Sequence, residues 1–152
     1  MKTPIDFNGF IQVSLIVKDI EKAAREWCDL FDAPMPEIHI QKKGPGDGVI
    51  YRDKEADYEF KLASIAAKDR GFIIELHEAV RGGNTYQEFY DKHGVGVHHL
   101  GFEAGDKTEA IIGELKEKGY RMRSTGTYPG GSWAIVDSED RLGVNLNIKP
   151  KR

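Results

Sequence analysis

The stretch GVGVHHLGFE at residues 94–103 decides the fold, because it repeats the character of FIQVSLIV at residues 10–17. Both stretches are rich in β-branched and apolar residues, and each predicts a strand. The first strand leads into a helix over 20–31, which Asp19 caps, and the second leads into a helix over 106–118. The chain therefore begins the same supersecondary unit twice.

Each half continues in the same way after its helix. In the first half, period-two patterns predict strands at 49–51, 58–62 and 72–77. In the second half, they predict strands at 120–125, 132–137 and 143–149. The repeat predicts an α+β fold of two tandem βαβββ modules, and since such units bury little core alone, we expect them to pair their sheets.

The two modules are expected to form one domain over residues 9–150. Module 1 covers about 9–80, a linking helix covers about 85–93, and module 2 covers about 96–150.

Capping signals mark the helix boundaries. Thr85 and Glu88 form a capping box at the start of the linking helix, and Gly94 ends it. Asp106 and Glu109 form the same pair for the helix of module 2.

Charge and composition exclude two broad classes of partner. The 152 residues carry 22 Lys and Arg against 25 Asp and Glu, a net charge of −3, so no broad basic surface for nucleic acid is expected. No apolar run approaches the roughly 18 residues that span a bilayer. The first residues lack the apolar stretch of a secretory signal, and the single cysteine, Cys28, fits a reducing compartment. We expect a cytoplasmic globular protein whose partner is a small molecule rather than nucleic acid or a membrane.

Alternation along four strands places polar side chains of an unusual kind on one face. Because side chains at i and i+2 share a face of a strand, each strand has a polar side, and Gln12, Glu75, His99 and Asn147 lie on those sides. All four side chains can offer nitrogen or oxygen to a divalent metal. The alternative is a one-sided antiparallel sheet whose polar face lies in water.

The internal repeat favours convergence of the four residues. Superposing the first strands of the two modules sets Gln12 opposite His99. Superposing the last strands sets Glu75 opposite Asn147. In a sheet curved into a cup, a pseudo-two-fold axis would bring all four to one point.

Four stretches resemble the vicinal oxygen chelate superfamily, which includes glyoxalase I, methylmalonyl-CoA epimerase, extradiol dioxygenases and bleomycin resistance proteins. They are FIQVSLIVKDIEKAAREW, FIIELHE, GVGVHHLGFE and DRLGVNLNIKP, and the resemblance covers nearly the whole chain. TYQEFYDKHGVGVHHLGF and GGSWAIVDSEDRLGVNLNI look most like the methylmalonyl-CoA epimerase-like branch. The resemblance implies a U-shaped, cupped mixed sheet around a metal, with helices outside, and a homodimer.

Carried over position by position, the resemblance implies that Gln12, Glu75, His99 and Asn147 hold a divalent metal, with zinc, manganese, cobalt, nickel and iron left open. Asn147 departs from the family pattern, in which a glutamate is common at this position and helps to move a proton. An amide carries no charge and cannot act as a base. A site without any metal therefore stays open as an alternative.

Proton transfer then needs another side chain, and we expect Glu75 and His77 to supply it. They share the inward face of one strand, and a histidine has a reference pKa near 6.5 that suits neutral pH. Two other interpretations stay open: Glu75 pairs with a cation such as Lys149, and His77 lies at the rim of the cup, half in water. Glu59 and Glu103 are further candidate bases.

Substrate contacts are expected from Ser14 and Asn145, which face inward. His98 faces the helices and is expected to be structural or solvent-exposed. Four basic residues are expected either to lie on a solvated surface or to meet an acidic group such as a CoA phosphate; they are Lys42, Lys43, Arg121 and Arg123.

The leading functional hypothesis is a metal-dependent epimerase or isomerase. It would remove a proton next to a carbonyl, with an acyl-CoA thioester as one substrate class, and the metal would stabilise the enolate. One alternative is a non-catalytic small-molecule binding protein of the resistance type, which Asn147 favours. A glyoxalase-type lyase is the second alternative.

Overall fold

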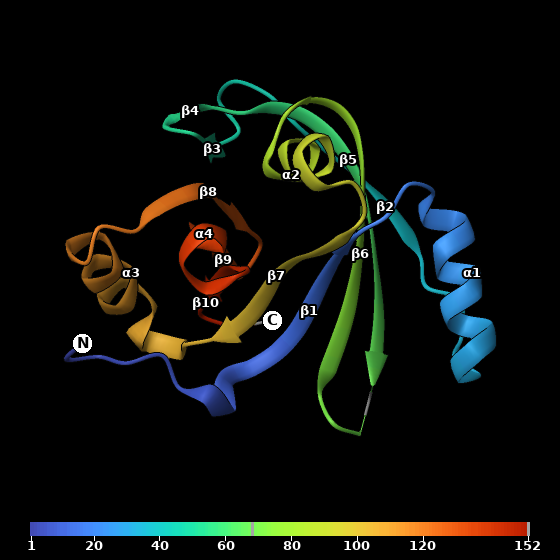
Figure 1. The fold of residues 1–152 in the computed structure, drawn as a ribbon, viewed down its shortest axis with the longest axis horizontal. Coiled ribbons are helices and arrows are strands. Elements are labelled where there is room, and N and C mark those ends of the chain that lie inside the picture. The colour runs from blue at the N-terminus through green and yellow to red at the C-terminus, as the bar shows by residue number, and fades with distance from the viewer. Residues whose placement is uncertain (68, 152) are drawn as a thin grey trace.

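The computed structural model describes residues 1–67 and 69–151, and a curled mixed sheet is its frame (Figure 1). Within that described chain the sheet has ten strands, in the order β2-β5-β6-β1-β7-β10-β9-β8-β3-β4. The strands are β1 Phe10–Ile16, β2 Ile38–Lys43, β3 Ile50–Tyr51, β4 Lys54–Glu55, β5 Asp57–Ala67, β6 Phe72–Gly83, β7 Gly96–Glu103, β8 Arg121–Tyr128, β9 Gly131–Asp137 and β10 Asn145–Lys149.

Four strands form the centre of the sheet and relate the two modules. β1 pairs antiparallel with β7, so the two modules meet through their first strands. Each first strand also pairs in parallel with the last strand of its own module, β1 with β6 and β7 with β10. The predicted α+β fold with a cupped mixed sheet is confirmed.

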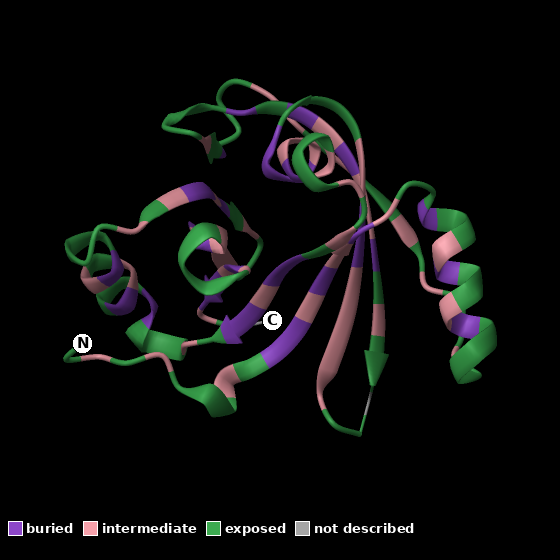
Figure 2. Cartoon of the chain, viewed as in Figure 1, coloured by how far each residue is buried: buried purple, intermediate pink, exposed green. Residues whose placement is uncertain are grey.

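Helices pack on both sides of the sheet: two cover its outside, and the helix that carries Tyr86 lies on the inner side with His77 (Figure 1). They are α1 Ile20–Phe31, α2 Thr85–His93, α3 Thr108–Glu117 and α4 Glu139–Leu142. α1 and α3 lie on opposite flanks (Figure 1), and each buries one apolar stripe. In α1 the buried stripe includes Ile20 and Ala24, which pack on Leu76 and Ala63 of the sheet, while the other side is exposed (Figure 2).

Another apolar cluster lies around α2. Tyr86 and Phe89 of this helix pack with Ile16 of β1 and with Tyr58 and Phe60 of β5. The rings of Tyr86 and Phe89 also lie 4.9 Å and 5.5 Å from the ring of His98 on β7, so α2 joins the two modules through packing as well as through the chain.

A hairpin from module 1 extends to the far edge of module 2. Residues 49–51, predicted as one of the three strands of module 1, form β3, which pairs with β4 and with β8. β2 takes the place in the module instead, next to β5. The predicted strand is present as Ile50–Tyr51, but its expected place in the sheet of module 1 was wrong, because the pairing partner of a short strand is set by tertiary contacts.

Side chains hold this hairpin in place. Its turn has positive φ at Arg52 (49°) and Asp53 (64°), as a two-residue hairpin turn requires. The Arg52 guanidinium bonds Glu88 of α2 and donates to Asp137 of β9 at 2.6 Å. The hairpin thus links α2 to the sheet of module 2.

The predicted caps have mixed outcomes. Asp19 caps α1 by accepting from the Lys22 amide, as predicted. The predicted capping box at Thr85 is wrong, because Asn84 caps α2 and accepts from the amides of residues 86 and 87. The predicted pair at Asp106 is also wrong, since Asp106 lies in a 3₁₀ turn and α3 begins after it without a side-chain cap among the described residues.

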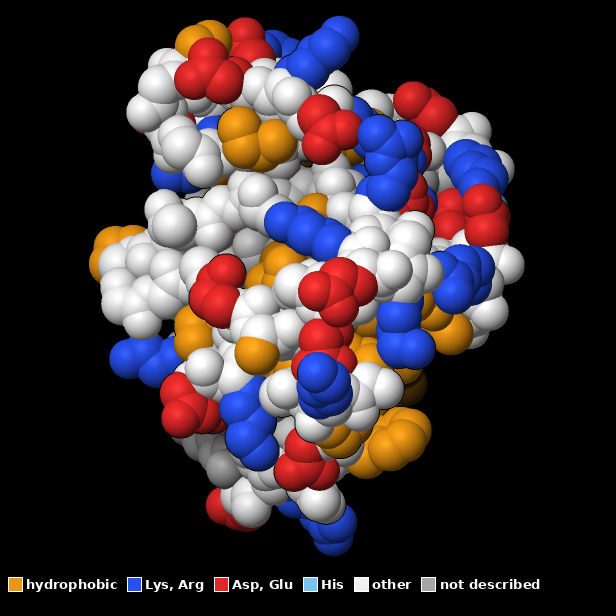
Figure 3. Space-filling view, turned by 90° about the vertical axis from the view of Figure 1, so that its left-hand side faces the viewer, with side chains coloured by type: hydrophobic (Ala, Val, Ile, Leu, Met, Phe, Trp, Pro, Cys, Tyr) orange, Lys and Arg blue, Asp and Glu red, His pale blue; other side chains and the backbone are white. Residues whose placement is uncertain are grey.

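The surface carries both signs of charge. On the face shown in Figure 3, acidic and basic side chains are interspersed. Within residues 1–67 and 69–151, no helix is both long enough and apolar enough to cross a bilayer. The homodimer and the cytoplasmic location stay predictions.

Candidate functional site

The four central strands bring the predicted residues together on the inner face of the sheet. Gln12 comes from β1, His99 from β7 and Asn147 from β10, and their side chains are buried in mutual contact. Gly101 makes room for this packing, since a β-carbon there would lie 2.9 Å from the Cδ of Gln12. Glu75 on β6 lies one strand further, beside Ser14.

Hydrogen bonds fix the orientation of His99. Gln12 Nε2 lies 3.1 Å and Asn147 Nδ2 lies 3.5 Å from His99 Nε2. Because amide NH₂ groups donate, we assign an accepting lone pair to His99 Nε2 and its ring proton to Nδ1. His99 Nδ1–H then donates to His98 Nδ1 at 2.8 Å, and His98 Nε2–H donates to the Thr85 hydroxyl at 2.8 Å. His98 is structural, as predicted, and it sets the tautomer of His99.

Burial keeps these histidines neutral. It lowers the pKa of His98 to about 3, with the Arg123 charge acting in the same direction. The pKa of His99 and that of His77 fall well below their ordinary value, again chiefly through burial. A neutral imidazole with its lone pair directed into the cup accepts a hydrogen bond or binds a cation.

Lys149 places a positive charge at the centre of the cup. It is two residues beyond Asn147 on β10, is 8% exposed, and its Nζ donates to Gln12 Oε1 at 2.5 Å. The same charge lowers the pKa of the Glu75 carboxyl, against the larger raising effect of burial. It also lowers the pKa of His77 and of His99. The Lys149 ammonium is therefore close to most of the side chains that were expected to bind a metal.

One feature of the expected metal site fits a cation. Asn147 Oδ1 is buried and, among the described residues, has no hydrogen-bond partner. It is an acceptor within the pocket that a cation or a donating ligand would satisfy.

The donor set as a whole does not fit a divalent metal. The Gln12 oxygen already accepts from an ammonium, and the Glu75 carboxylate is balanced by the same charge. Only two of the four expected ligands, Glu75 and His99, are His, Cys, Asp or Glu, and in the described part of the chain no group of three or more such side chains is arranged to hold a metal. Two unit charges 4 Å apart interact by about 4 kcal/mol at an effective dielectric constant near 20, and a divalent ion doubles that repulsion. At the expected metal site of Gln12, Glu75, His99 and Asn147, the Lys149 ammonium already bonds one of the ligand oxygens and opposes the effect of burial on the one carboxylate.

A pocket of about 320 Å³ opens beside these residues, between the two modules. Glu75, His77, Asn147 and Lys149 line its polar side. Its apolar side consists mainly of aromatic and aliphatic residues, namely Val49, Tyr58, Phe60, Leu62, Tyr86, Trp133 and Ile135. A volume at the low end of the range for ligand sites fits a small acyl group.

Ser14, His77 and Glu75 lie in contact one after another at the pocket wall. His77 Nε2 lies 3.2 Å from Glu75 Oε1, and its Nδ1 lies 2.9 Å from the Ser14 hydroxyl. The Tyr86 ring stacks on the imidazole, with centroids 4.1 Å apart. His77 is 2% exposed, so the interpretation that placed it at a wet rim is wrong. The aromatic packing of α2 explains its burial.

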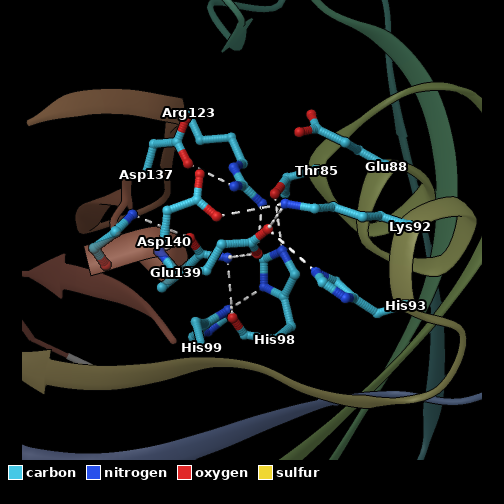
Figure 4. Close-up of polar contacts among 12 residues, drawn as sticks. Thr85, Glu88, Lys92, His93, His98, His99, Arg123, Asp137, Glu139 and Asp140 are labelled. Carbon is cyan, nitrogen blue, oxygen red and sulfur yellow. Dashed lines mark hydrogen bonds and ion pairs between the residues drawn. The ribbon is translucent and has the colours of Figure 1, made fainter. Parts of the chain in front are cut away.

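Behind the site, a charged network joins α2 to the β8–β9 hairpin and α4 (Figure 4). Arg123 donates to Asp137 at 2.5 Å and to Glu139 at 3.3 Å. Lys92 donates to Glu139 at 2.8 Å, and the His93 ring nitrogen lies 3.2 Å from the same carboxylate. Both expectations for Arg123, a solvated surface and a CoA phosphate contact, are wrong, because this guanidinium is 3% exposed and paired with two carboxylates.

Neither predicted substrate contact lies on the pocket wall. Ser14 is fully buried behind His77. Asn145 accepts from the amides of Ser138 and Glu139 and donates to the His98 carbonyl. Asn145 therefore fixes the start of α4 against β7.

Sequence reasoning missed the central role of Lys149 and the contribution of Tyr86. Lys149 was considered only as a partner for Glu75, although its parity with Asn147 already placed it on the inner face. Nothing in the sequence near Tyr86 indicated that this ring would stack on His77, since that contact depends on the docking of α2.

Comparison with known proteins places the fold. The family model described as Glyoxalase/Bleomycin resistance protein/Dioxygenase superfamily matches residues 11–136. No curated protein matches the sequence.

Solved structures share the architecture at low identity. Methylmalonyl-CoA epimerase from Mycobacterium tuberculosis has a TM-score of 0.64 at 18% identity, covering 95% of this chain and 88% of the epimerase. The hypothetical protein BH1468 from Bacillus halodurans C-125 has a TM-score of 0.63 at 20% identity, with 94% of both chains covered. A methylmalonyl-CoA epimerase in complex with methylmalonyl-CoA and NH₄⁺ has a TM-score of 0.60 at 17% identity, with 92% of both chains covered. The family model covers most of the chain and the cupped sheet matches, and the chain therefore belongs to the glyoxalase/bleomycin resistance protein/dioxygenase, or vicinal oxygen chelate, superfamily.

Proposed function

We propose that this protein is an enzyme of the epimerase or isomerase type, which removes and returns a proton on the carbon next to a carbonyl. The observation that carries the proposal is a carboxylate, Glu75, on the wall of a small pocket that also holds the positive charge of Lys149. Proton removal next to a carbonyl needs a base at the carbon and positive charge near the oxygen. Both lie in one pocket here.

Glu75 is the proposed base. When it acts, the C–H bond breaks, a carboxyl O–H bond forms, and the electron pair moves onto the carbonyl oxygen as an enolate. Burial raises the pKa of this carboxyl, which makes the carboxylate a stronger base. Return of the proton to the same face exchanges the hydrogen, and return to the opposite face inverts the centre.

His77 is proposed to position Glu75. Its imidazole stays neutral because burial holds its pKa well below the ordinary value, so it is a poor store for the proton. With the Ser14 hydroxyl donating to Nδ1, the ring proton lies on Nε2, which is 3.2 Å from Glu75 Oε1, and this contact restricts the direction of the carboxylate. Ser14 thus acts through His77.

An acyl-CoA thioester is the proposed substrate class. It is supported by the similarity of the fold to methylmalonyl-CoA epimerases, one of them bound to methylmalonyl-CoA. The pocket volume of about 320 Å³ holds an acyl group and leaves the nucleotide part of CoA outside. Lys43 lines the same pocket and offers a second positive charge for an acidic substrate.

The test is exchange of the acyl α-hydrogen of methylmalonyl-CoA for deuterium in D₂O, followed by mass spectrometry. We expect the wild-type protein to catalyse exchange and Glu75→Gln to lose about 10²- to 10⁴-fold in rate, the usual contribution of a general base. Glu103→Gln is the matched control, since Glu103, a further candidate base from the sequence, is an exposed carboxylate at the end of β7 and is not among the residues that line the pocket. Equal rates in the wild type and Glu75→Gln would exclude Glu75 as the base.

A non-catalytic binding protein is the second candidate, and Asn147 favours it. This amide replaces a carboxylate that could move a proton, and its buried Oδ1 is ready to accept from a ligand. Saturable binding of an acyl-CoA without any exchange, in the wild type as in Glu75→Gln, would establish this alternative.

A further inference from the structure

We propose that the Lys149 ammonium takes the place of the divalent metal in this cup, both by occupying the cation position and by supplying the positive charge toward which the substrate oxygen turns. The second half of this proposal, that Lys149 supplies charge to the substrate oxygen, rests on the proposed function. The first half, that Lys149 occupies the cation position, concerns binding alone and does not depend on the proposed function.

The geometry around Gln12 carries the first half. Gln12 Oε1, one of the oxygens expected to bind a metal, accepts from Lys149 Nζ at 2.5 Å. The amide nitrogen of the same side chain lies 3.1 Å from His99 Nε2, so this one amide connects the lysine to the histidine. Gln12 is fully buried in the space that the missing β-carbon of Gly101 leaves, so it cannot turn toward another cation without repacking.

Charge balance supports the same conclusion. The described donor set has one carboxylate, Glu75, with one imidazole and two amides, and Lys149 already brings one positive charge close to that carboxylate. A divalent ion would raise the local charge from about zero to two in a buried site, where like charges repel strongly. Removing the lysine would leave a cup with a carboxylate, a directed imidazole lone pair and two amide oxygens, all of which are ligands for divalent metals.

The position of Lys149 on the pocket wall carries the second half. Lys149 and Asn147 line the pocket together with Glu75. A substrate carbonyl oxygen that enters between Lys149 and Asn147 meets the N–H donors of the Lys149 ammonium. The α-carbon of the substrate then lies toward the Glu75 carboxylate. Stabilisation of a developing oxyanion by a fixed positive donor is chemically equivalent to what a bound metal supplies.

The test is titration with Co²⁺, followed by visible absorption and calorimetry on protein freed of any affinity tag. We expect the wild type to show no saturable Co²⁺ site. Lys149→Met should gain one, with an affinity at least about tenfold higher than that of any residual Co²⁺ binding by the wild type. Lys149→Gln is the second variant, in case methionine disturbs the fold, and it should behave in the same way. Lys149→Arg keeps the charge and should still exclude Co²⁺.

Two controls assign the effect to this site. Lys43→Met removes one positive charge from the same pocket on β2 and should gain no Co²⁺ site. Adding His99→Ala to Lys149→Met should abolish the gained site, which separates it from exposed histidines such as His39.

Stoichiometric Co²⁺ binding by the wild type, as tight as in Lys149→Met, would overturn the proposal. Failure of both Lys149→Met and Lys149→Gln to bind, while folded by circular dichroism, would also overturn it, because the remaining donors and not the lysine would then exclude the metal. No substrate is present in this experiment, so its outcome is independent of whether the protein catalyses proton transfer.

Discussion

A single histidine shows how the residues of the cup depend on one another. His99 directs its Nε2 lone pair inward because its Nδ1–H donates a hydrogen bond to His98. His98 is held in turn by a hydrogen bond to the Thr85 hydroxyl. All three side chains are buried, so water cannot replace a lost partner. A change at Thr85 on α2 is therefore felt on the far side of the sheet.

We predict that Thr85→Val destabilises the protein by about 1–3 kcal/mol, because it keeps the shape of the side chain but leaves the His98 Nε2–H buried without an acceptor. Thr127→Val is the matched control, since Thr127 is exposed on β8. Urea unfolding of both variants and the wild type measures the difference. An equal free energy of unfolding for Thr85→Val and the wild type would contradict the hydrogen-bonded chain.

For single residues, the sequence predicted which face of a strand each side chain occupies, but not which other side chains it contacts. Strand parity placed Gln12, His99 and Asn147 on one face, and they are in contact. Parity could not show that the long side chain of Lys149 bends back to Gln12. Nor could it show the link between His98 and His99, whose side chains start on opposite faces of β7.

Among the elements, α3 shows how backbone conformation alone decides what a glycine contributes to stability. Gly113 lies in the middle of this helix with open space around its missing β-carbon. Gly119 follows the helix with a φ of 85° and also has open space. Space being equal, only backbone conformation distinguishes the two glycines.

We predict opposite effects for the same substitution at these positions. Gly113→Ala should stabilise the protein by about 0.5–1 kcal/mol, since alanine loses less backbone entropy in a helix. Gly119→Ala should destabilise it by about 1 kcal/mol, since a β-carbon is strained in the left-handed region. Thermal unfolding of the two variants measures both signs, and a shift in the same direction for both would refute this explanation.

Helices were easier to predict than strand partners. The apolar stripe of α1 and its Asp19 cap are local, and both predictions are confirmed. The β3–β4 hairpin pairs with a strand about 70 residues away in sequence, and Arg52 holds it through Glu88 and Asp137 on two other elements. No local pattern contains that information.

The whole molecule buries three neutral histidines, and this makes its stability depend on pH. His77, His98 and His99 have a pKa below the ordinary value near 6.5, so below pH 6.5 the unfolded chain binds protons that the native state does not. The free energy of unfolding therefore falls as the pH falls through this range. Glu75 acts in the opposite sense at lower pH, because its raised pKa lets the native state take up a proton first.

We predict a loss of about 3–4 kcal/mol in the free energy of unfolding between pH 7.5 and pH 5.5, at about 1.4 kcal/mol for each histidine less the opposing effect of Glu75. Urea titrations at the two pH values measure it. His39→Asn serves as the control, since that histidine is about half exposed and the pH dependence should not change. A free energy that is flat over this range would contradict neutral burial of the three rings.

At the scale of the molecule, the repeat in the sequence predicted an α+β fold of paired modules, and the resemblance implied that their sheet is cupped. In such a cup, pseudo-symmetry brings the polar residues together. What it could not predict is which cation the cup holds. The donor residue types alone allow a metal, and only their contacts show that an ammonium already lies among them.

The most direct measurement is α-hydrogen exchange of methylmalonyl-CoA in D₂O by the wild-type protein, with and without an excess of a metal chelator. We predict exchange at the same rate in both conditions, because the proposed mechanism uses Glu75 as the base and Lys149 as the source of positive charge. A rate that falls to background with the chelator and returns on addition of a divalent metal would contradict this mechanism.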